Sequence, residues 1–155
     1  MKNYIGINSV NADLLCEKLN ILLSNYQVFY MNTRGFHWNI TGEKFFELHL
    51  KFEEIYNNTI LKIDEVAERI LTLGGVPIHS FSEYLKVAEI PEIKNTNEGK
   101  EAVQFLLEGF EVLIRLQREI LQIAADANDE ATNALMSDYI REQEKLVWMF
   151  VAYLK

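Results

Sequence analysis

A long regular pattern of apolar and polar positions lies between Phe45 and Leu73. Apolar residues recur there at steps of three and four: Phe45, Leu48, Phe52, Ile55, Tyr56, Ile60, Ile63, Ala67, Ile70 and Leu71. This spacing predicts one long amphipathic helix with an apolar stripe on one side. Gly74 and Gly75 follow the last apolar position and Pro77 cannot continue a helix, so we expect the helix to end there.

Three further stretches carry a helical pattern, and each starts at capping or acidic residues. Their expected starts are Ser9 or Asn11, Thr96 or Asn97, and Asp129 with Glu130. Gly35 lies in the first of these helices, near His37, where it either lets another backbone approach or marks a helix end. Thr41 is the expected cap of the helix that begins at Phe45. Residues 1–8 form a short tail ahead of a single domain at 9–155.

More than twenty residues connect the second long helix to the third, too many for a structureless connection in a compact domain. Ser80 and Glu83 have the spacing of a capping box and predict a short helix through Tyr84 and Val87. His79 has no neighbouring ligand motif, and we expect it on the surface. A long crossover suits a bundle whose second and third helices run parallel. The sequence therefore predicts an all-α four-helix bundle with a short extra helix in the crossover between helices 2 and 3.

Two pairs of polar residues stand out on the Phe45–Leu73 helix. His49 and Glu53 lie four residues apart, as do Asp64 and Glu68, so each pair shares a helical face. The nineteen residues from His49 to Glu68 span roughly 28 Å, so one metal cannot bind both within one chain. The midpoint of His49 and Glu68 falls between positions 58 and 59, and so does the midpoint of Glu53 and Asp64. A two-fold axis there would set Glu68 and Asp64 of an antiparallel copy opposite His49 and Glu53, which indicates two half-sites that a dimer completes.

Taken one by one, these residues have simpler explanations. A histidine among phenylalanines is more often a hydrogen-bonded core or interface residue than a ligand. Asp64, Glu65 and Glu68 alone would form a solvated acidic face with Arg69 as a local partner. Taken together with His37, however, the set offers mixed nitrogen and oxygen ligands, which suit iron, zinc or manganese better than calcium.

The same stretch resembles the Dps family, the mini-ferritins named as DNA-binding proteins from starved cells. The resemblance rests on several dozen positions with fixed gaps and extends across nearly the whole chain. They include His37-Trp38-Asn39-x-x-Gly42, Phe45-Phe46-x-Leu48-His49-x-x-Phe52-Glu53-Glu54-x-Tyr56, Asp64-Glu65-x-Ala67-Glu68-Arg69-Ile70, Leu73-Gly74-Gly75, Pro77, Glu83-Tyr84-Leu85 and Trp148-Met149. The resemblance implies that the bundle is ferritin-like.

The resemblance also implies an enzyme, with a ferroxidase centre at a dimer interface inside a hollow dodecamer. Iron (Fe²⁺) would be oxidised there to Fe³⁺, by preference with hydrogen peroxide, and stored inside as ferric oxyhydroxide, which protects against oxidative stress. Carried over by position, the catalytic and metal-binding residues are His37, His49 and Glu53 from one subunit and Asp64 and Glu68 from its neighbour. A two-metal site at the interface is one arrangement of this set.

Some features of this chain differ from the family pattern. Some members carry Asp where this chain has Glu53, whose longer side chain keeps the charge but shifts the second metal or its occupancy. Trp38 would intercept oxidising equivalents in the family, and a packed interfacial aromatic is the alternative. The family's three-fold pores are lined by acids near the start of the last helix. Asp129 and Glu130 match that region, Ala134 replaces an aspartate of several relatives, and Asp126 or Asp138 would compensate.

Composition narrows the class of protein further. The 155 residues suffice for one domain with a core, and 49% hydrophobic residues with two prolines suit a helical globule. The net charge of −8 argues against a general nucleic-acid surface and suits a protein that attracts cations. Cys16 is the sole cysteine, so we expect no internal disulfide and a buried thiol. The sequence shows neither a signal peptide nor a membrane span, so the cytoplasm is the expected location.

Two other functions remain open. A classical di-iron oxygenase or reductase would use Glu-x-x-His pairs on core helices, but the residues three before the histidines are Arg34, Phe46 and Val76. A DNA-compacting structural protein with incidental metal binding is the second alternative. Direct DNA binding by a basic tail is not expected, because the tail offers only Lys2 and the chain ends at Lys155.

Overall fold

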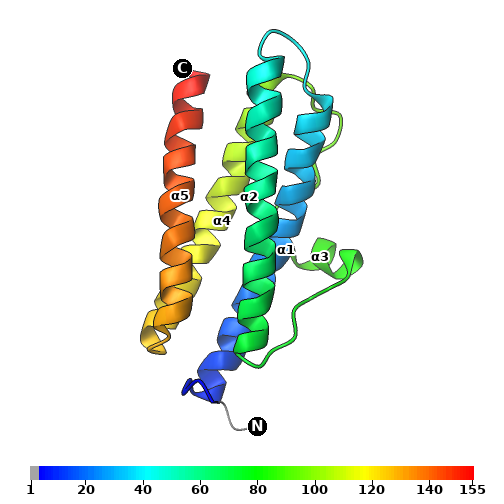
Figure 1. Ribbon diagram of the computed structural model, residues 1–155. Coiled ribbons are helices and arrows are strands. Elements are labelled where there is room, and N and C mark those ends of the chain that lie inside the picture. The colour runs from blue at the N-terminus through cyan, green and yellow to red at the C-terminus, as the bar shows by residue number, and fades with distance from the viewer. Residues whose placement is uncertain (1–3) are drawn as a thin grey trace.

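The computed structural model describes residues 4–155, so Lys2 lies outside the described part. The elements in this part are α1 (Ser9–Asn39), α2 (Phe45–Thr72), α3 (Phe81–Val87), α4 (Gly99–Asp126) and α5 (Glu130–Leu154). Figure 1 shows α1, α2, α4 and α5 side by side in a bundle, with α3 beside α1. Both α2 and α4 start at the same end of the bundle, so the connection between them returns along its length and contains α3. The predicted four-helix bundle with its crossover helix is confirmed.

The end of α2 and the start of α3 follow the sequence prediction. Gly74 has φ +92°, the left-handed conformation that glycine adopts without a steric penalty, and the Gly75 N–H donates to the Ile70 carbonyl (2.9 Å). Ser80 caps α3 by accepting from the Glu83 N–H (3.4 Å), and its hydroxyl donates to the Glu83 carboxylate (2.9 Å). No helix within residues 4–155 is long and apolar enough to cross a membrane.

The predicted cap of α2 is wrong. α2 begins after Lys44, which makes no side-chain capping bond. Thr41 instead donates from both its N–H (3.0 Å) and its hydroxyl (3.2 Å) to the carbonyl of Asn97, and thereby ties the α1–α2 turn to the segment before α4. The remaining caps lie within a few residues of the predicted positions: Asn8 for α1, Glu98 for α4 and Asp129 for α5.

The core is aromatic and aliphatic around α1. Tyr26, Phe52 and Phe110 are among the largest fully buried side chains. Cys16 is buried as predicted, with its thiol 3.7 Å from the Ile70 carbonyl. Neither predicted role of Gly35 is seen in the chain, because α1 continues to Asn39 and a Cβ at Gly35 would meet no atom within 4 Å.

The pore prediction is wrong for Asp129, because its carboxylate is buried where α5 begins. The residue is 2% exposed. Its carboxylate accepts from the Arg69 guanidinium (2.7 Å), the Thr132 N–H (3.1 Å) and the Thr132 hydroxyl (2.5 Å). With these partners Asp129 joins α2 to α5 and is not available to line a channel. The other acids considered for a pore are exposed: Asp126, Glu130 and Asp138.

These contacts set the pH at which Asp129 stabilises the fold. Burial alone would raise the pKa of Asp129, but the hydrogen bonds from Arg69 and Thr132 outweigh it and hold the pKa below its ordinary value. Since the pKa is lower in the folded than in the unfolded chain, the stabilisation is present above about pH 4 and is lost as the pH falls through the folded pKa.

We expect Asp129→Asn to lower the free energy of unfolding by about 2 kcal/mol at pH 7, because it removes a buried charge from a hydrogen-bonded pair. The difference in the free energy of unfolding between this variant and the unmodified chain should narrow as the pH falls below about 4. Asp138→Asn is the control, since Asp138 forms an exposed ion pair with Arg141 worth at most about 0.5 kcal/mol. Guanidinium unfolding midpoints at one subunit concentration measure both. Equal shifts for the two variants would contradict this account.

Candidate metal centre

The two histidines of the predicted half-site hold each other across the end of α1 and the start of α2. His37 lies in the last turn of α1 and is 8% exposed, and His49 lies in the second turn of α2. The Nδ1 of His37 is 2.7 Å from the backbone oxygen of His49, and the Nδ1 of His49 is 2.8 Å from the backbone oxygen of His37. We call this reciprocal pair of hydrogen bonds the histidine clasp.

The histidine clasp determines which tautomer each neutral ring adopts. A carbonyl oxygen can only accept, so each Nδ1 carries the proton and donates it. In that neutral tautomer Nε2 keeps its lone pair, which is the form of imidazole that binds metals. Metal-binding histidines characteristically donate their second ring nitrogen to a carboxylate or backbone carbonyl in this way. The His37 carbonyl is one of the last four of α1, which lack an intrahelical donor, and the ring Nδ1–H of His49 satisfies it.

Neighbouring rings lock the clasp in position. The His37 and His49 rings are stacked, with centroids 3.8 Å apart and planes 16° apart. Phe45 stacks on the other face of His49 (4.9 Å, 19°), and Tyr56 meets His37 edge to face (5.2 Å). Rotating either imidazole would break this stack as well as a hydrogen bond.

The carboxylates are distributed as the helical spacing requires. Glu53 is half-buried one turn beyond His49, whereas Asp64 and Glu68 are exposed towards the far end of α2. Within residues 4–155 of one chain, no three His, Cys, Asp or Glu side chains form a group that could hold a metal ion. One chain therefore brings the two histidines together, places Glu53 one turn away and leaves Asp64 and Glu68 apart from them.

Arg34, which the sequence did not single out as a site residue, lies near the clasp among aromatic rings. Its guanidinium carbon is 5.5 Å from the Tyr30 ring, 4.8 Å from Trp38 and 5.2 Å from Tyr56, distances at which cation–π attraction acts. Its Nη1 donates to the Tyr30 hydroxyl (2.9 Å), and its Nε is buried without a hydrogen-bond partner in the described part of the chain. The four-residue spacing of Tyr30, Arg34 and Trp38 was the available signal, because it places all three on one face of α1.

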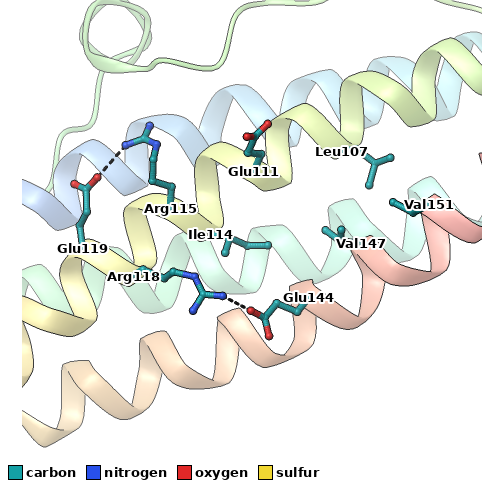
Figure 2. Close-up of a pocket in the computed structure, with 9 residues that line it drawn as sticks. All are labelled: Leu107, Glu111, Ile114, Arg115, Arg118, Glu119, Glu144, Val147 and Val151. Atoms are coloured by element: carbon teal, nitrogen blue, oxygen red, sulfur yellow. Dashed lines mark hydrogen bonds and ion pairs between the residues drawn. The ribbon is translucent and has the colours of Figure 1, made fainter.

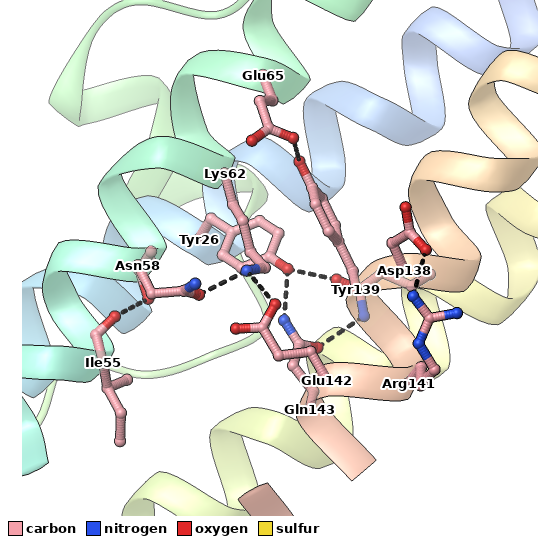
Figure 3. A network of polar contacts seen from close by, with 12 residues as sticks. Tyr26, Ile55, Asn58, Lys62, Glu65, Asp138, Tyr139, Arg141, Glu142 and Gln143 are labelled. Atoms are coloured by element: carbon pink, nitrogen blue, oxygen red, sulfur yellow. Dashed lines mark hydrogen bonds and ion pairs between the residues drawn. The ribbon is translucent and has the colours of Figure 1, made fainter. Parts of the chain in front are cut away.

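The middle of the bundle, where a classical di-iron enzyme holds its metals, contains polar side chains of another kind. Tyr26 donates to Gln117, Gln117 donates to Gln143 (2.7 Å), and Gln143 donates back to Tyr26 (2.7 Å). Figure 3 shows the adjoining contacts between α2 and α5. We call the hydrogen-bonded ring and these adjoining side chains together the polar centre. Its members are Tyr26, Asn58, Lys62, Glu65, Gln117, Tyr139, Glu142 and Gln143. The chain's three histidines all lie elsewhere, which disfavours the classical di-iron alternative.

A groove of about 640 Å³ is formed by α4 and α5, which do not carry the histidine clasp. Figure 2 shows apolar side chains along it, flanked by the pairs Arg118–Glu144 and Arg115–Glu119 (3.0 Å). Its lining residues are Leu107, Glu111, Ile114, Arg115, Arg118, Glu119, Glu144, Val147 and Val151. Glu119 and Glu144 pair with arginines, and the groove's lining contains no histidine. The clasp is therefore the better candidate for a metal centre.

Comparisons with known proteins identify the family. The model of the ferritin-like domain matches residues 16–155. The "DNA protection during starvation protein" of Porphyromonas gingivalis is 47% identical over 148 residues, which cover 96% of this chain and 93% of that protein. The chain belongs to the Dps family. An uncharacterised protein of Haemophilus influenzae is 55% identical over 151 residues, or 97% of this chain and 94% of that protein.

Solved Dps structures agree with this assignment over the whole fold. The Dps structure from Vibrio cholerae O1 has a TM-score of 0.97 at 59% identity and covers 99% of this chain and 97% of that one. The Dps structure from Bacillus brevis has a TM-score of 0.91 at 34% identity, covering 96% and 100%. The ferritin-like bundle predicted from the sequence is confirmed. As a member of the Dps family, the chain serves iron storage and protection against oxidative stress.

Proposed function

We propose that this chain is a cytoplasmic ferroxidase that oxidises Fe(II), by preference with hydrogen peroxide, and stores ferric mineral inside a hollow dodecamer. The observation that carries the proposal is the histidine clasp, which engages the Nδ1 of both imidazoles and leaves each Nε2 to bind a metal. Glu53 lies one turn further along α2. Imidazole suits Fe(II), and carboxylates add affinity for the harder Fe(III) product.

A second copy of the chain supplies the remaining ligands in this proposal. His49 and Glu53 at one end of α2 and Asp64 and Glu68 at the other are symmetric about a point between positions 58 and 59. The two acids are exposed, so they can face an antiparallel partner. A two-fold axis then gives two identical sites in each dimer. His37 joins each site through the clasp.

The stacked imidazoles suit two iron ions better than one. Their centroids are 3.8 Å apart and their planes nearly parallel, so each Nε2 serves its own metal position. Metals in two-metal sites lie about 3.5–4 Å apart. Two Fe(II) ions give the two electrons that reduce one hydrogen peroxide, with two protons, to two water molecules. The carboxylates of Glu53, Asp64 and Glu68 offset the charge of the two Fe(III) ions formed, and Glu53 reaches its ion through a longer side chain than the Asp of some relatives.

Trp38 has a role in this proposal as the residue that intercepts oxidising equivalents leaving the site. Its indole is 57% exposed and follows His37 directly in the chain. The Arg34 guanidinium covers one face of the ring. The alternative, a packed interfacial aromatic, also agrees with the exposure of Trp38 in a single chain.

We expect His49→Ala and Glu68→Ala each to slow peroxide-driven Fe(II) oxidation by about 100-fold, because each removes a ligand of the shared site. His79→Ala and Glu54→Ala are matched controls: His79 is exposed with its Nδ1 at the Pro77 carbonyl, and Glu54 is exposed and pairs with Lys51. Anaerobic loading with Fe(II), followed by peroxide and the rise of ferric absorbance, measures the rate. Gel filtration checks that every variant still elutes as a large shell. An unmodified chain that elutes strictly as a monomer, or ligand variants as fast as the controls, would disprove the proposal.

DNA binding is a separate question, raised by the name of the Porphyromonas gingivalis relative. Sequence-independent DNA binding requires Lys or Arg to neutralise phosphates, and this chain carries a net charge of −8 with Lys2 as the one basic residue of its tail. We therefore expect no tail-dependent gel shift of duplex DNA at physiological salt. A salt-sensitive shift that disappears when residues 1–8 are deleted would show that the tail binds DNA after all.

A further inference from the structure

Side chains from all four long helices meet at the polar centre in a specific arrangement. Bundles that hold two metals in their core take one carboxylate from each of two helices and a pair spaced i, i+3 from each of the other two. The polar centre has the same distribution over the four helices with different residue types, and its two carboxylates, Glu65 and Glu142, lie at its exposed rim. Its positions are Tyr26 on α1, Gln117 on α4, Lys62 with Glu65 on α2, and Tyr139 with Glu142 on α5.

The Lys62 ammonium is buried against the oxygens and rings of the polar centre. Lys62 is 5% exposed. Its Nζ is 2.5 Å from the Asn58 side-chain oxygen, 2.8 Å from a Glu142 carboxylate oxygen and 5.0 Å from the centroid of the Tyr139 ring. Figure 3 shows the ammonium between Asn58 and Glu142. Amide and carboxylate oxygens are ligands of divalent cations, and an aromatic face also attracts positive charge.

A second carboxylate borders the same centre. The Tyr139 hydroxyl donates to Glu65 (2.8 Å), and the Tyr26 and Tyr139 rings meet edge to face at 6.2 Å. Burial raises the pKa of both phenols, and the negative charges of Glu65 and Glu142 raise it further, so both carboxylates act on the centre. Lys62 pairs with Glu142 and is the one basic residue among the members of the polar centre as defined above.

We propose that the Lys62 ammonium takes the place of a metal ion at the polar centre and keeps divalent cations out of the bundle. A buried ammonium is stable when carboxylate and amide oxygens surround it, and one cation satisfies the acceptors that a metal would otherwise use. Iron binding is thereby confined to the histidine clasp. That last consequence rests on the proposed function, whereas the exclusion of cations from the polar centre does not.

The test uses the assembled protein with the clasp removed by His37→Ala and His49→Ala, so that binding at the proposed interface does not contribute. Lys62→Glu in this background replaces the ammonium by a carboxylate three residues before Glu65, so that α2 carries a carboxylate pair spaced i, i+3. We expect it to bind about one additional Co²⁺ per chain, about tenfold more tightly than any site of the background protein. Equilibrium dialysis gives the stoichiometry, and the visible Co²⁺ spectrum reports the ligands. Bound Co²⁺ should also raise the unfolding midpoint.

Arg141→Glu in the same background is the matched control. It makes the same change of charge on α5 close to the centre, but Arg141 is exposed and pairs with Asp138, so no additional Co²⁺ should bind. Lys62→Glu that folds and binds no more Co²⁺ than the control would overturn the proposal. If Lys62→Glu does not fold without metal, the proposal requires either that Co²⁺ restores its folding or that Lys62→Gln folds and binds the additional Co²⁺. If neither happens, the proposal is overturned. Loss of the proposed function would leave these outcomes unchanged, because the background lacks both clasp histidines.

Discussion

The fixed rise of an unbroken helix decides how this chain can bind iron. α2 carries His49 and Glu53 near one end and Asp64 and Glu68 near the other, roughly 28 Å apart from His49 to Glu68. Rotamer changes move a side chain by a few ångströms, so they cannot bring these groups to one metal. The proposed ligand set is therefore complete only with a second, antiparallel α2. On this account assembly and iron oxidation depend on the same surface.

The bundle supports that surface from behind. The clasp attaches the start of α2 to the end of α1, and three polar contacts attach the rest of α2 to α5: Lys62 to Glu142, Glu65 to Tyr139, and Arg69 to Asp129. Each of the three contacts involves at least one buried side chain. The exposed acids Asp64 and Glu68 lie on another face of the same helix. The α2 residues that attach the helix to α5 are thus distinct from Asp64 and Glu68, whereas His49 both attaches α2 to α1 and belongs to the proposed site.

Helix extents could be predicted from the sequence because apolar spacing is local, and so could the placement of the proposed ligands on α2, because the i, i+4 pairs are local too. The clasp could not be predicted, since His37 and His49 come from different helices and their contact depends on how α1 crosses α2. Thr41 was assigned as a cap for the same reason: its partner, the Asn97 carbonyl, is remote in sequence. Lys62 left a readable signal, a charged residue in the buried stripe of α2, because a lysine at such a position needs acceptors around it.

The inter-subunit origin of the site can be measured by mixing two inactive variants. His49→Ala and Glu68→Ala chains are denatured, mixed in equal amounts and co-assembled, and the peroxide-driven oxidation of Fe(II) is compared with that of each parent. Random pairing makes about half of the dimers mixed, and each mixed dimer has one site with both lesions and one intact site. The account predicts recovery of about a quarter of the unmodified rate. Mixed shells that form and oxidise iron no faster than either parent would show that each site is built within one chain.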